Sequence, residues 1–130
     1  MPFARWFAYG GVWSAAMDAH AALHKLTEVS QQIEDAVVVE GGEALASTVD
    51  PERAARFAEL AARILAVADA IDGSTPVLQV EAATEEGSVF LVREGDTIVA
   101  ATTAPTPVIG LVMYDLRTCL RALAPEREPA

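Results

Sequence analysis

The sequence predicts an α+β domain whose elements follow the order helix, two strands, helix, three strands, helix. Residues 77–103 hold three strand-like runs that are separated by short turns at 85–87 and 94–96. Connections this short join only antiparallel neighbours, so these runs form a meander. The glycine pair 41–42 separates two further strand-like runs. Apolar residues recur at helical spacing before, between and after the two groups of strands.

The first helix is predicted at residues 13–32, because leucines and other apolar residues recur there at helical spacing, in a stripe that continues to Ile33. A valine-rich strand is predicted at 36–40 and its partner at 43–48. Both residues of the glycine pair between them can take a positive φ without steric cost, so the pair predicts a two-residue hairpin turn.

The second helix is predicted from Pro51 to Asp72. Asp50 is a suitable N-cap, and proline is favoured at the first helical position because it needs no hydrogen bond for its nitrogen there. Gly73 follows the last turn, and glycine readily supplies the left-handed conformation of a C-cap. Both ends of this helix are therefore indicated by local chemistry rather than by periodicity alone.

The second helix also carries apolar and small residues over an arc wider than one face. Its large apolar stripe consists of Phe57, Leu60, Ile64, Val67 and Ile71. The arc is widened by Ala54, Ala58, Ala61, Ala62, Leu65 and Ala68. A helix this broadly apolar is usually buried on two sides. We therefore expect one side to contact the chain's own sheet and the other to contact a second copy of the chain.

The strands of the meander are predicted at 77–84, 88–93 and 97–103. The last helix is predicted at 107–123, where Thr106 precedes a proline in the manner of an N-cap and apolar residues again recur at helical spacing. Because the meander needs a cover for its apolar side chains, this helix is expected to lie on one face of the sheet.

Length and composition limit the classes of function. A chain of 130 residues is long enough for one domain with its own core. Its formal net charge of −10 disfavours nucleic acid and anionic lipid surfaces as partners. Cys119 is the only cysteine, so no disulfide can form within the chain and a reducing, cytoplasmic compartment is expected. No apolar run approaches the roughly 20 residues of a membrane-spanning helix.

The domain itself is predicted at residues 17–124. Residues 1–16 form an extension that contains five of the eight aromatic residues, namely Phe3, Trp6, Phe7, Tyr9 and Trp13. We expect this extension to pack across the sheet or against a partner subunit. The alternatives are an exposed interaction patch, a misassigned start with the domain beginning at Met17, and a cleaved signal peptide. Residues 125–130 are a polar tail that is expected to fray.

The sequence contains no motif for catalysis or for phosphate binding. His20 and His24 are four residues apart and could share a metal ion. Only Cys119 or a carboxylate such as Asp18 could supply a third ligand, so two polar residues on a half-exposed helix are the preferred interpretation. Cys119 lies on an apolar stripe and is interpreted as a buried packing thiol. We therefore expect no enzyme activity, no cofactor and no metal site.

The charged residues are interpreted as solvated surface. Arg53, Arg56 and Arg63 lie along the second helix, and an arginine can assist GTP hydrolysis in a neighbouring protein. A solvated helical face is the preferred interpretation of these three arginines. The acidic pairs at 34–35 and 85–86 lie at predicted turns, where they favour solubility rather than acid–base chemistry.

Three stretches of the sequence together resemble the Roadblock/LC7 family. They are LHKLTEVSQQIEDAVVVEGGEALAST at 23–48, DPERAARFAELAARIL at 50–65 and EGSVFLVREGDTIVAATTAPTPVIGLVMYDLRTCLRAL at 86–123. The family pattern is a leucine-spaced helix that leads to a valine-rich strand and a glycine turn. A central helix rich in small residues follows, then a meander and a helix start that contains Leu-Gly, here at residues 109–111. The resemblance covers about residues 17–123.

The resemblance implies a profilin/longin-like fold, in which a five-stranded antiparallel sheet lies between helices. It also implies a dimer that aligns the central helices of two copies and joins their third strands into one sheet. The third strand, 77–84, is therefore the sheet edge that we expect to be paired. The interface residues are predicted to be Arg56, Phe57, Leu60, Arg63 and Ile64 of the central helix, and Val77, Gln79 and Glu81 of the third strand.

The resemblance further implies a function, that of a prokaryotic, non-enzymatic homodimer. As a regulator or scaffold, it would bind a small Ras-like GTPase and modulate the nucleotide state of that GTPase. One alternative is a structural adaptor subunit of a motor or signalling complex, without effect on GTP hydrolysis. The other is a profilin-like small-molecule sensor, which predicts an enclosed pocket between the sheet and a helix. The valine-rich and alanine-rich faces favour a filled core instead.

Overall fold

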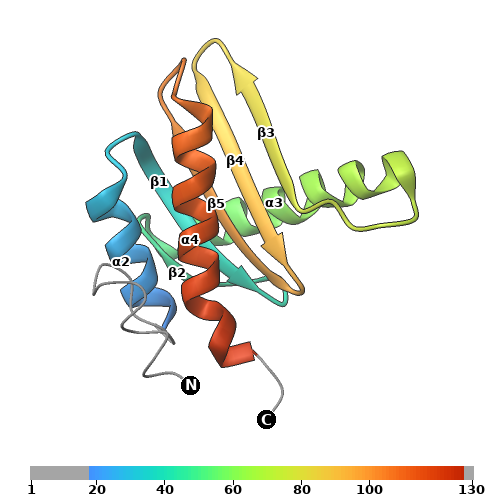
Figure 1. Ribbon diagram of the computed structural model, residues 1–130, viewed down its shortest axis with the longest axis horizontal. Helices are drawn as coiled ribbons and strands as arrows, with labels where there is room; N and C mark the ends of the chain where they lie inside the picture. Colours follow the sequence, from blue (N-terminus) through green and yellow to red (C-terminus); the bar gives the residue numbers. More distant parts are fainter. Residues whose placement is uncertain (1–17, 128–130) are drawn as a thin grey trace.

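The computed structural model describes residues 18–127 (Figure 1). The elements are α2 (Ala19–Val29), β1 (Ile33–Glu40), β2 (Glu43–Ser47), α3 (Pro51–Asp72), β3 (Gln79–Thr84), β4 (Gly87–Glu94), β5 (Thr97–Thr103) and α4 (Ile109–Arg127). This order confirms the predicted succession of helices and strands. The predicted aromatic extension at 1–16 and the last residues of the predicted tail, 128–130, lie outside the described residues.

The strands form one antiparallel sheet in the spatial order β2-β1-β5-β4-β3. The predicted meander is confirmed, because β3 pairs with β4 and β4 pairs with β5. The two groups of strands meet in the middle of the sheet, where Val38 of β1 lies opposite Val99 of β5. β2 and β3 are the two edge strands.

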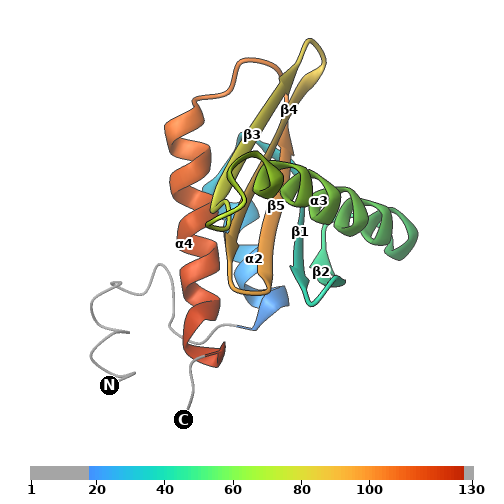
Figure 2. The ribbon, with the colours of Figure 1, turned by 90° about the vertical axis from the view of Figure 1, so that its right-hand side faces the viewer.

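Helices cover both faces of the sheet, with α2 and α4 on one face and α3 on the other (Figures 1 and 2). On the α2 and α4 face, the core includes Val38, Phe90 and Leu116, all fully buried. On the α3 face, the core includes Val37 and Leu91. Neighbouring side chains along a strand point to opposite faces. This alternation explains why continuous valine runs serve a sheet that is covered on both sides.

The ends of α3 are those predicted. The Asp50 carboxylate accepts a hydrogen bond from the Arg53 N–H at 2.9 Å, which satisfies one of the free donors of the first turn. Pro51 occupies the first helical position. At the other end, Gly73 has a φ of 82°, and its N–H donates to the carbonyl oxygen of Asp69 at 3.0 Å. Glycine adopts this conformation without the strain that a Cβ would add.

The first helix is shorter than predicted. Asp18 is its N-cap in an extended conformation, so the helix begins at Ala19, and the predicted part at 13–17 lies outside the described residues. It ends at Val29, because Ser30 is already extended at a φ of −114°. The predicted continuation of the helical stripe to Ile33 is wrong, since that residue begins β1 and lies opposite Thr103.

The last helix begins later than predicted, and Thr106 does not cap it. Thr106 has a φ of 56°, and its hydroxyl donates to the Pro105 carbonyl oxygen at 2.6 Å. The Val112 N–H instead donates to the carbonyl of Val108 at 3.1 Å, which makes Val108 the residue at the cap position. The helix then continues to Arg127, beyond its predicted end at residue 123.

Within the described residues, no helix combines the length and apolarity that crossing a membrane requires.

Candidate interaction site on α3 and the β3 edge

The two sides of α3 differ in the size of their apolar side chains. Ala58, Ala61 and Leu65 are buried against the sheet. The large residues of the predicted stripe are mostly open to solvent, since Leu60 is 53%, Val67 is 70% and Ile71 is 84% exposed. The prediction that α3 is apolar over more than one face is therefore confirmed, and its second side has no cover within the described chain.

The exposed part of α3 also extends past the edge of its own sheet. α3 packs on β1 and β2, and Figure 1 shows its C-terminal half running beyond β3. Val67 and Ile71 belong to this half. A half-helix with exposed valine and isoleucine side chains is an apolar surface of the kind that marks protein–protein interfaces.

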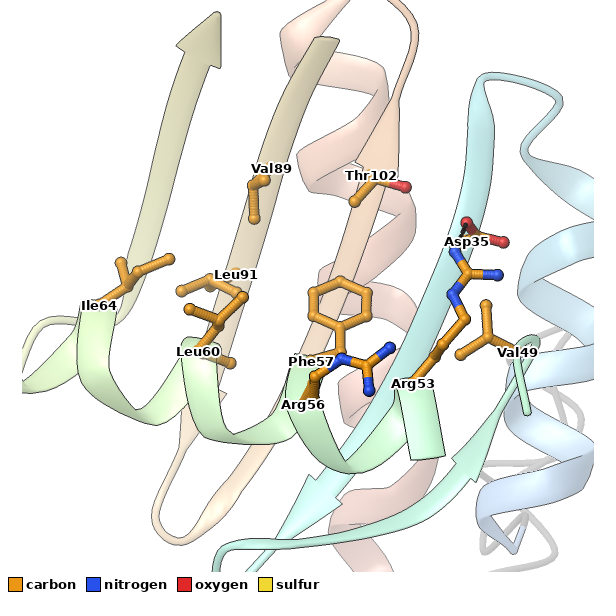
Figure 3. A pocket seen from close by; sticks show the side chains of 11 residues that line it. Asp35, Val49, Arg53, Arg56, Phe57, Leu60, Ile64, Val89, Leu91 and Thr102 are labelled. Atoms are coloured by element: carbon orange, nitrogen blue, oxygen red, sulfur yellow. Dashed lines mark ion pairs between the residues drawn. The ribbon is translucent and has the colours of Figure 1, made fainter. Parts of the chain in front are cut away.

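An open groove lies beside α3 on the same face of the sheet (Figure 3). It has a volume of about 280 Å³. Its apolar walls are formed by Phe57, Leu60, Ile64, Val89 and Leu91. In Figure 3 the labelled side chains of α3 and of the strands converge on this groove, which is only partly enclosed. Its shape is therefore that of a docking surface more than that of a small-molecule cavity.

Polar side chains lie at one end of the groove. Arg53 is 3.7 Å from Asp35 of β1, measured from Nη2 to Oδ2. Arg56 is 3.6 Å from Glu52, measured from Nη1 to Oε2. All four side chains are at least a third exposed. Exposed pairs of this kind contribute about 0–1 kcal/mol, so neither arginine is firmly held.

The predicted interface residues lie close to this surface. Arg63 is exposed on α3, as are Arg56 and Leu60, whereas Phe57 and Ile64 are half-buried in the groove. The predicted residues of the third strand lie at the β3 edge. Gln79 is exposed and its Oε1 accepts a hydrogen bond from Arg117 at 2.8 Å, Glu81 is half-buried, and Val77 precedes the strand. All eight predicted residues are thus on α3 or at the neighbouring edge.

One pair of residues that holds this surface in place was not predicted from the sequence. Asp69 in the last turns of α3 forms an ion pair with Arg93 of β4. Arg93 also donates to the carbonyl oxygen of Val77, so the pair closes the connection between α3 and β3. The only signal in the sequence is an arginine at the end of an otherwise apolar strand, and its partner lies 24 residues away.

The residues considered for chemistry lie elsewhere. Cys119 is buried as predicted, and burial raises the pKa of its thiol to about 12, which makes the thiolate rare at neutral pH. His24 lies 3.2 Å from Glu28 on the exposed side of α2. Across residues 18–127, no group of three histidine, cysteine or acidic side chains is placed to hold a metal ion.

The structure of this chain is similar to several solved protein structures. No family model matches the sequence, and no curated protein matches it. A Roadblock/LC7 domain from Streptomyces avermitilis matches with a TM-score of 0.75 and 17% identity, over 85% of this chain and 98% of that chain. The gliding protein MglB from Thermus thermophilus matches with a TM-score of 0.66 and 19% identity, over 80% of this chain and 86% of that chain. MglB of Myxococcus xanthus matches with a TM-score of 0.71 and 15% identity, over 83% and 86% of the two chains.

These similarities concern the arrangement of the elements, because fewer than one residue in five is identical. They extend over most of this chain and over nearly all of the solved domains. The shared arrangement is the one predicted from the sequence, with the element order α-β-β-α-β-β-β-α and a five-stranded antiparallel sheet between helices. The chain therefore has the fold of the Roadblock/LC7 domains.

Proposed function

We propose that this protein is a non-enzymatic homodimer that binds a small Ras-like GTPase and modulates its nucleotide state. The observation that carries the proposal is the surface of α3, where large apolar side chains and an apolar groove are both open on one face of the sheet. In a single copy of the chain, this surface is exposed to solvent. A second copy covers it with the same residues, as symmetric dimers do.

The geometry of the dimer follows from the edge strand and the projecting helix. Antiparallel pairing of two β3 strands around a two-fold axis joins the sheets of both copies and removes two free edges. The same axis carries the C-terminal half of each α3 over the sheet of the other copy. There, Val67 and Ile71 meet the groove that is walled by Leu60 and Leu91. Each copy thus supplies both a projecting half-helix and a groove that receives one.

The association with a GTPase is supported by the family resemblance. Bacterial and archaeal Roadblock/LC7 proteins often regulate small Ras-like GTPases, and this chain has their fold. Its sequence has no phosphate-loop motif. We therefore propose that it acts on the nucleotide through the partner, by positioning the partner's own switch residues rather than by supplying catalytic groups. The cytoplasm, where such GTPases act, is the proposed location.

Light scattering coupled to size exclusion tests the homodimer. The wild-type chain is expected to have twice the mass of one copy, and the mass should persist on dilution. Val67→Glu combined with Ile71→Glu places carboxylates on the projecting half-helix and should yield monomers. Leu111→Glu is the matched control, because Leu111 is 56% exposed on α4, on the other face of the sheet. Equal masses for all three proteins would contradict the proposed interface.

Nucleotide assays test the second half of the proposal. Rates of GTP hydrolysis and nucleotide exchange are measured for small Ras-like GTPases from the same organism, with and without the wild-type protein. We expect binding and a changed rate for at least one of them, and no change with the monomeric double variant. Binding without any change of rate would favour the structural adaptor instead. If none of these GTPases binds the protein and no rate changes, the result would count against both the regulator and the structural adaptor.

A further inference from the structure

A second groove lies at the β2 edge of the sheet, away from the surface proposed for the homodimer. It has a volume of about 450 Å³. His20 of α2 lines it from one face of the sheet and residues of α3 line it from the other, so the groove passes around the edge strand β2. Its walls are mostly apolar and include Leu45, Val49, Pro51, Ala54 and Ala55. Proteins commonly cover an edge strand of this kind, because it could otherwise pair with other chains.

The described part of the chain begins beside this groove. Asp18 is the N-cap of α2, and His20, two residues further along, lines the groove. Residues 1–17, which lie outside the described residues, therefore join the fold at this point. An extended chain spans at most about 3.3–3.6 Å per residue, so Trp13 has a reach of about 17 Å from Asp18. The aromatic extension thus enters the fold where the groove is open.

The composition of residues 1–17 suits an apolar groove with an acidic rim. They contain five of the eight aromatic residues, and Arg5 is their only charged side chain. All 19 acidic residues belong to the rest of the chain, and one of them, Glu43, lines the groove. An aromatic side chain buries about 150–250 Å² of surface, and the small alanine side chains of α3 leave room for one. Both faces of the sheet are already covered by helices, so an extension that packs on the sheet must use an edge (Figures 1 and 2).

An alternative surface for the extension lies at the start of α4. Val108, Leu111 and Tyr114 are all exposed there. However, α2 begins near the last turns of α4, at the opposite end of that helix (Figures 1 and 2). A chain that leaves Asp18 must therefore run back along α4 to reach these residues, whereas it meets the groove at once. The position of Asp18 thus favours the groove.

We propose that the aromatic extension, residues 3–13, docks in the groove at the β2 edge of its own chain, with the indole of Trp13 against Leu45 and Ala55. The contact lies at the edge opposite β3, so it does not depend on the proposed homodimer. It covers β2 and leaves β3 as the edge that can pair with a second copy. The extension thereby directs self-association to the surface of α3 and β3.

Tryptophan fluorescence of the full chain tests this contact, because the two tryptophans of the sequence, Trp6 and Trp13, both belong to the extension. In the Trp6→Phe protein, the emission of Trp13 should be shifted to the blue of N-acetyltryptophanamide and should be quenched less by acrylamide. Leu45→Glu, added to this protein, places a carboxylate on the groove wall and should shift the emission to the red and increase the quenching. Leu111→Glu is the matched control, since it makes the same change at an exposed leucine on α4 and should leave both unchanged.

Three outcomes would overturn the proposal, with circular dichroism to check that every variant is folded. The first is a Trp13 emission in the Trp6→Phe protein that equals that of N-acetyltryptophanamide. The second is a red shift with Leu111→Glu but not with Leu45→Glu, which would place the extension on α4. The third is loss of the blue shift when Val67→Glu and Ile71→Glu make the protein monomeric, as light scattering verifies, because the extension would then dock on a second copy. If the shift persists in that monomer, the groove belongs to the same chain.

Discussion

Asp69 and Arg93 form a two-pronged ion pair that joins the end of α3 to β4. The Arg93 Nη2 is 2.6 Å from the Asp69 Oδ1, and Nη1 is 3.1 Å from Oδ2. The same guanidinium donates to the carbonyl oxygen of Val77 from Nε at 3.0 Å and from Nη2 at 2.6 Å. The Val77 N–H donates to Asp69 Oδ1 at 2.8 Å. Helix, connecting loop and sheet are thereby fixed relative to one another at the proposed interface.

Replacing Asp69 by asparagine should destabilise the fold and weaken self-association. Asparagine keeps the shape and one acceptor for the Val77 N–H, but it loses the charge that Arg93 requires, and Arg93 is only 16% exposed. We expect the thermal midpoint to fall by several degrees and the dimer to dissociate more readily. Glu28→Gln, which removes the surface contacts of Glu28 with His24 and Lys25 on α2, is the control and should leave the thermal midpoint and the self-association unchanged. Equal midpoints for Asp69→Asn and the control would contradict the role of the pair.

The same pair predicts how stability depends on pH. Hydrogen bonds from the Arg93 side chain, and then from the Val77 N–H, lower the pKa of Asp69 from its ordinary value of 3.8. A carboxyl group with a lowered pKa in the folded state stabilises the fold above its unfolded-state pKa and loses this effect as the pH falls through its folded-state pKa.

Denaturant unfolding of the wild type and Asp69→Asn measures this effect, because other titrating groups contribute equally to both and cancel. The difference between their free energies of unfolding should be constant above about pH 5 and should shrink below about pH 4. A difference that grows as the pH falls would have the wrong sign for an ionised Asp69 held by Arg93.

Two glycines should respond to alanine in opposite directions. Gly87 begins β4 with a φ of 155°, and a Cβ there would lie 2.4 Å from the carbonyl oxygen of Thr103 on β5. Since that oxygen belongs to the backbone, Gly87→Ala must force the two strands apart and should lower the thermal midpoint. Gly110 is the second residue of α4 and has nothing within 4 Å of the added Cβ, so Gly110→Ala should stabilise the protein, by less than the roughly 0.5–1 kcal/mol of a helix interior. If thermal unfolding shows that the two substitutions shift the midpoint in the same direction, this explanation is contradicted.

Local chemistry explains which parts of the fold could be predicted from the sequence. The ends of α3 were predictable because Asp50 and Gly73 act on their own neighbours in the chain. The start of α4 was not, because Thr106 uses its hydroxyl on the adjacent Pro105 carbonyl and adopts a positive φ, neither of which the residue types reveal. The extent of the first helix was overestimated, since the apolar spacing that ends at Ile33 fits a helix and a buried strand equally well over so few residues.

The candidate site was predictable in its composition but not in its orientation. The breadth of the apolar arc on α3 was visible in the sequence. Which side of it faces the sheet depends on packing, because the small side chains of Ala58 and Ala61 allow close approach to the strands and turn Val67 and Ile71 outward. The pairing of Asp69 with Arg93 joins residues 24 positions apart, and no periodic pattern encodes such a contact.

Two leucines on α3 separate the stability of the fold from that of the dimer. Leu65 is buried in the core on the α3 face, so Leu65→Ala should cost about 2–5 kcal/mol of folding free energy. Leu60 is 53% exposed in the single chain, so Leu60→Ala should cost the fold under about 1 kcal/mol. If a second copy covers Leu60, the same substitution should raise the dissociation constant of the dimer about tenfold, because part of a buried leucine is then lost in each copy.

The two variants should therefore differ in which measurement they change. Denaturant unfolding of each leucine variant in the background of the monomeric Val67→Glu and Ile71→Glu protein isolates the stability of the fold. Sedimentation equilibrium of each leucine variant alone gives the dissociation constant. Leu60→Ala should change mainly the dissociation constant, and Leu65→Ala should change mainly the free energy of unfolding. If Leu60→Ala leaves the dissociation constant unchanged, this leucine is not covered by a second copy, and the exposed side of α3 must have a different partner.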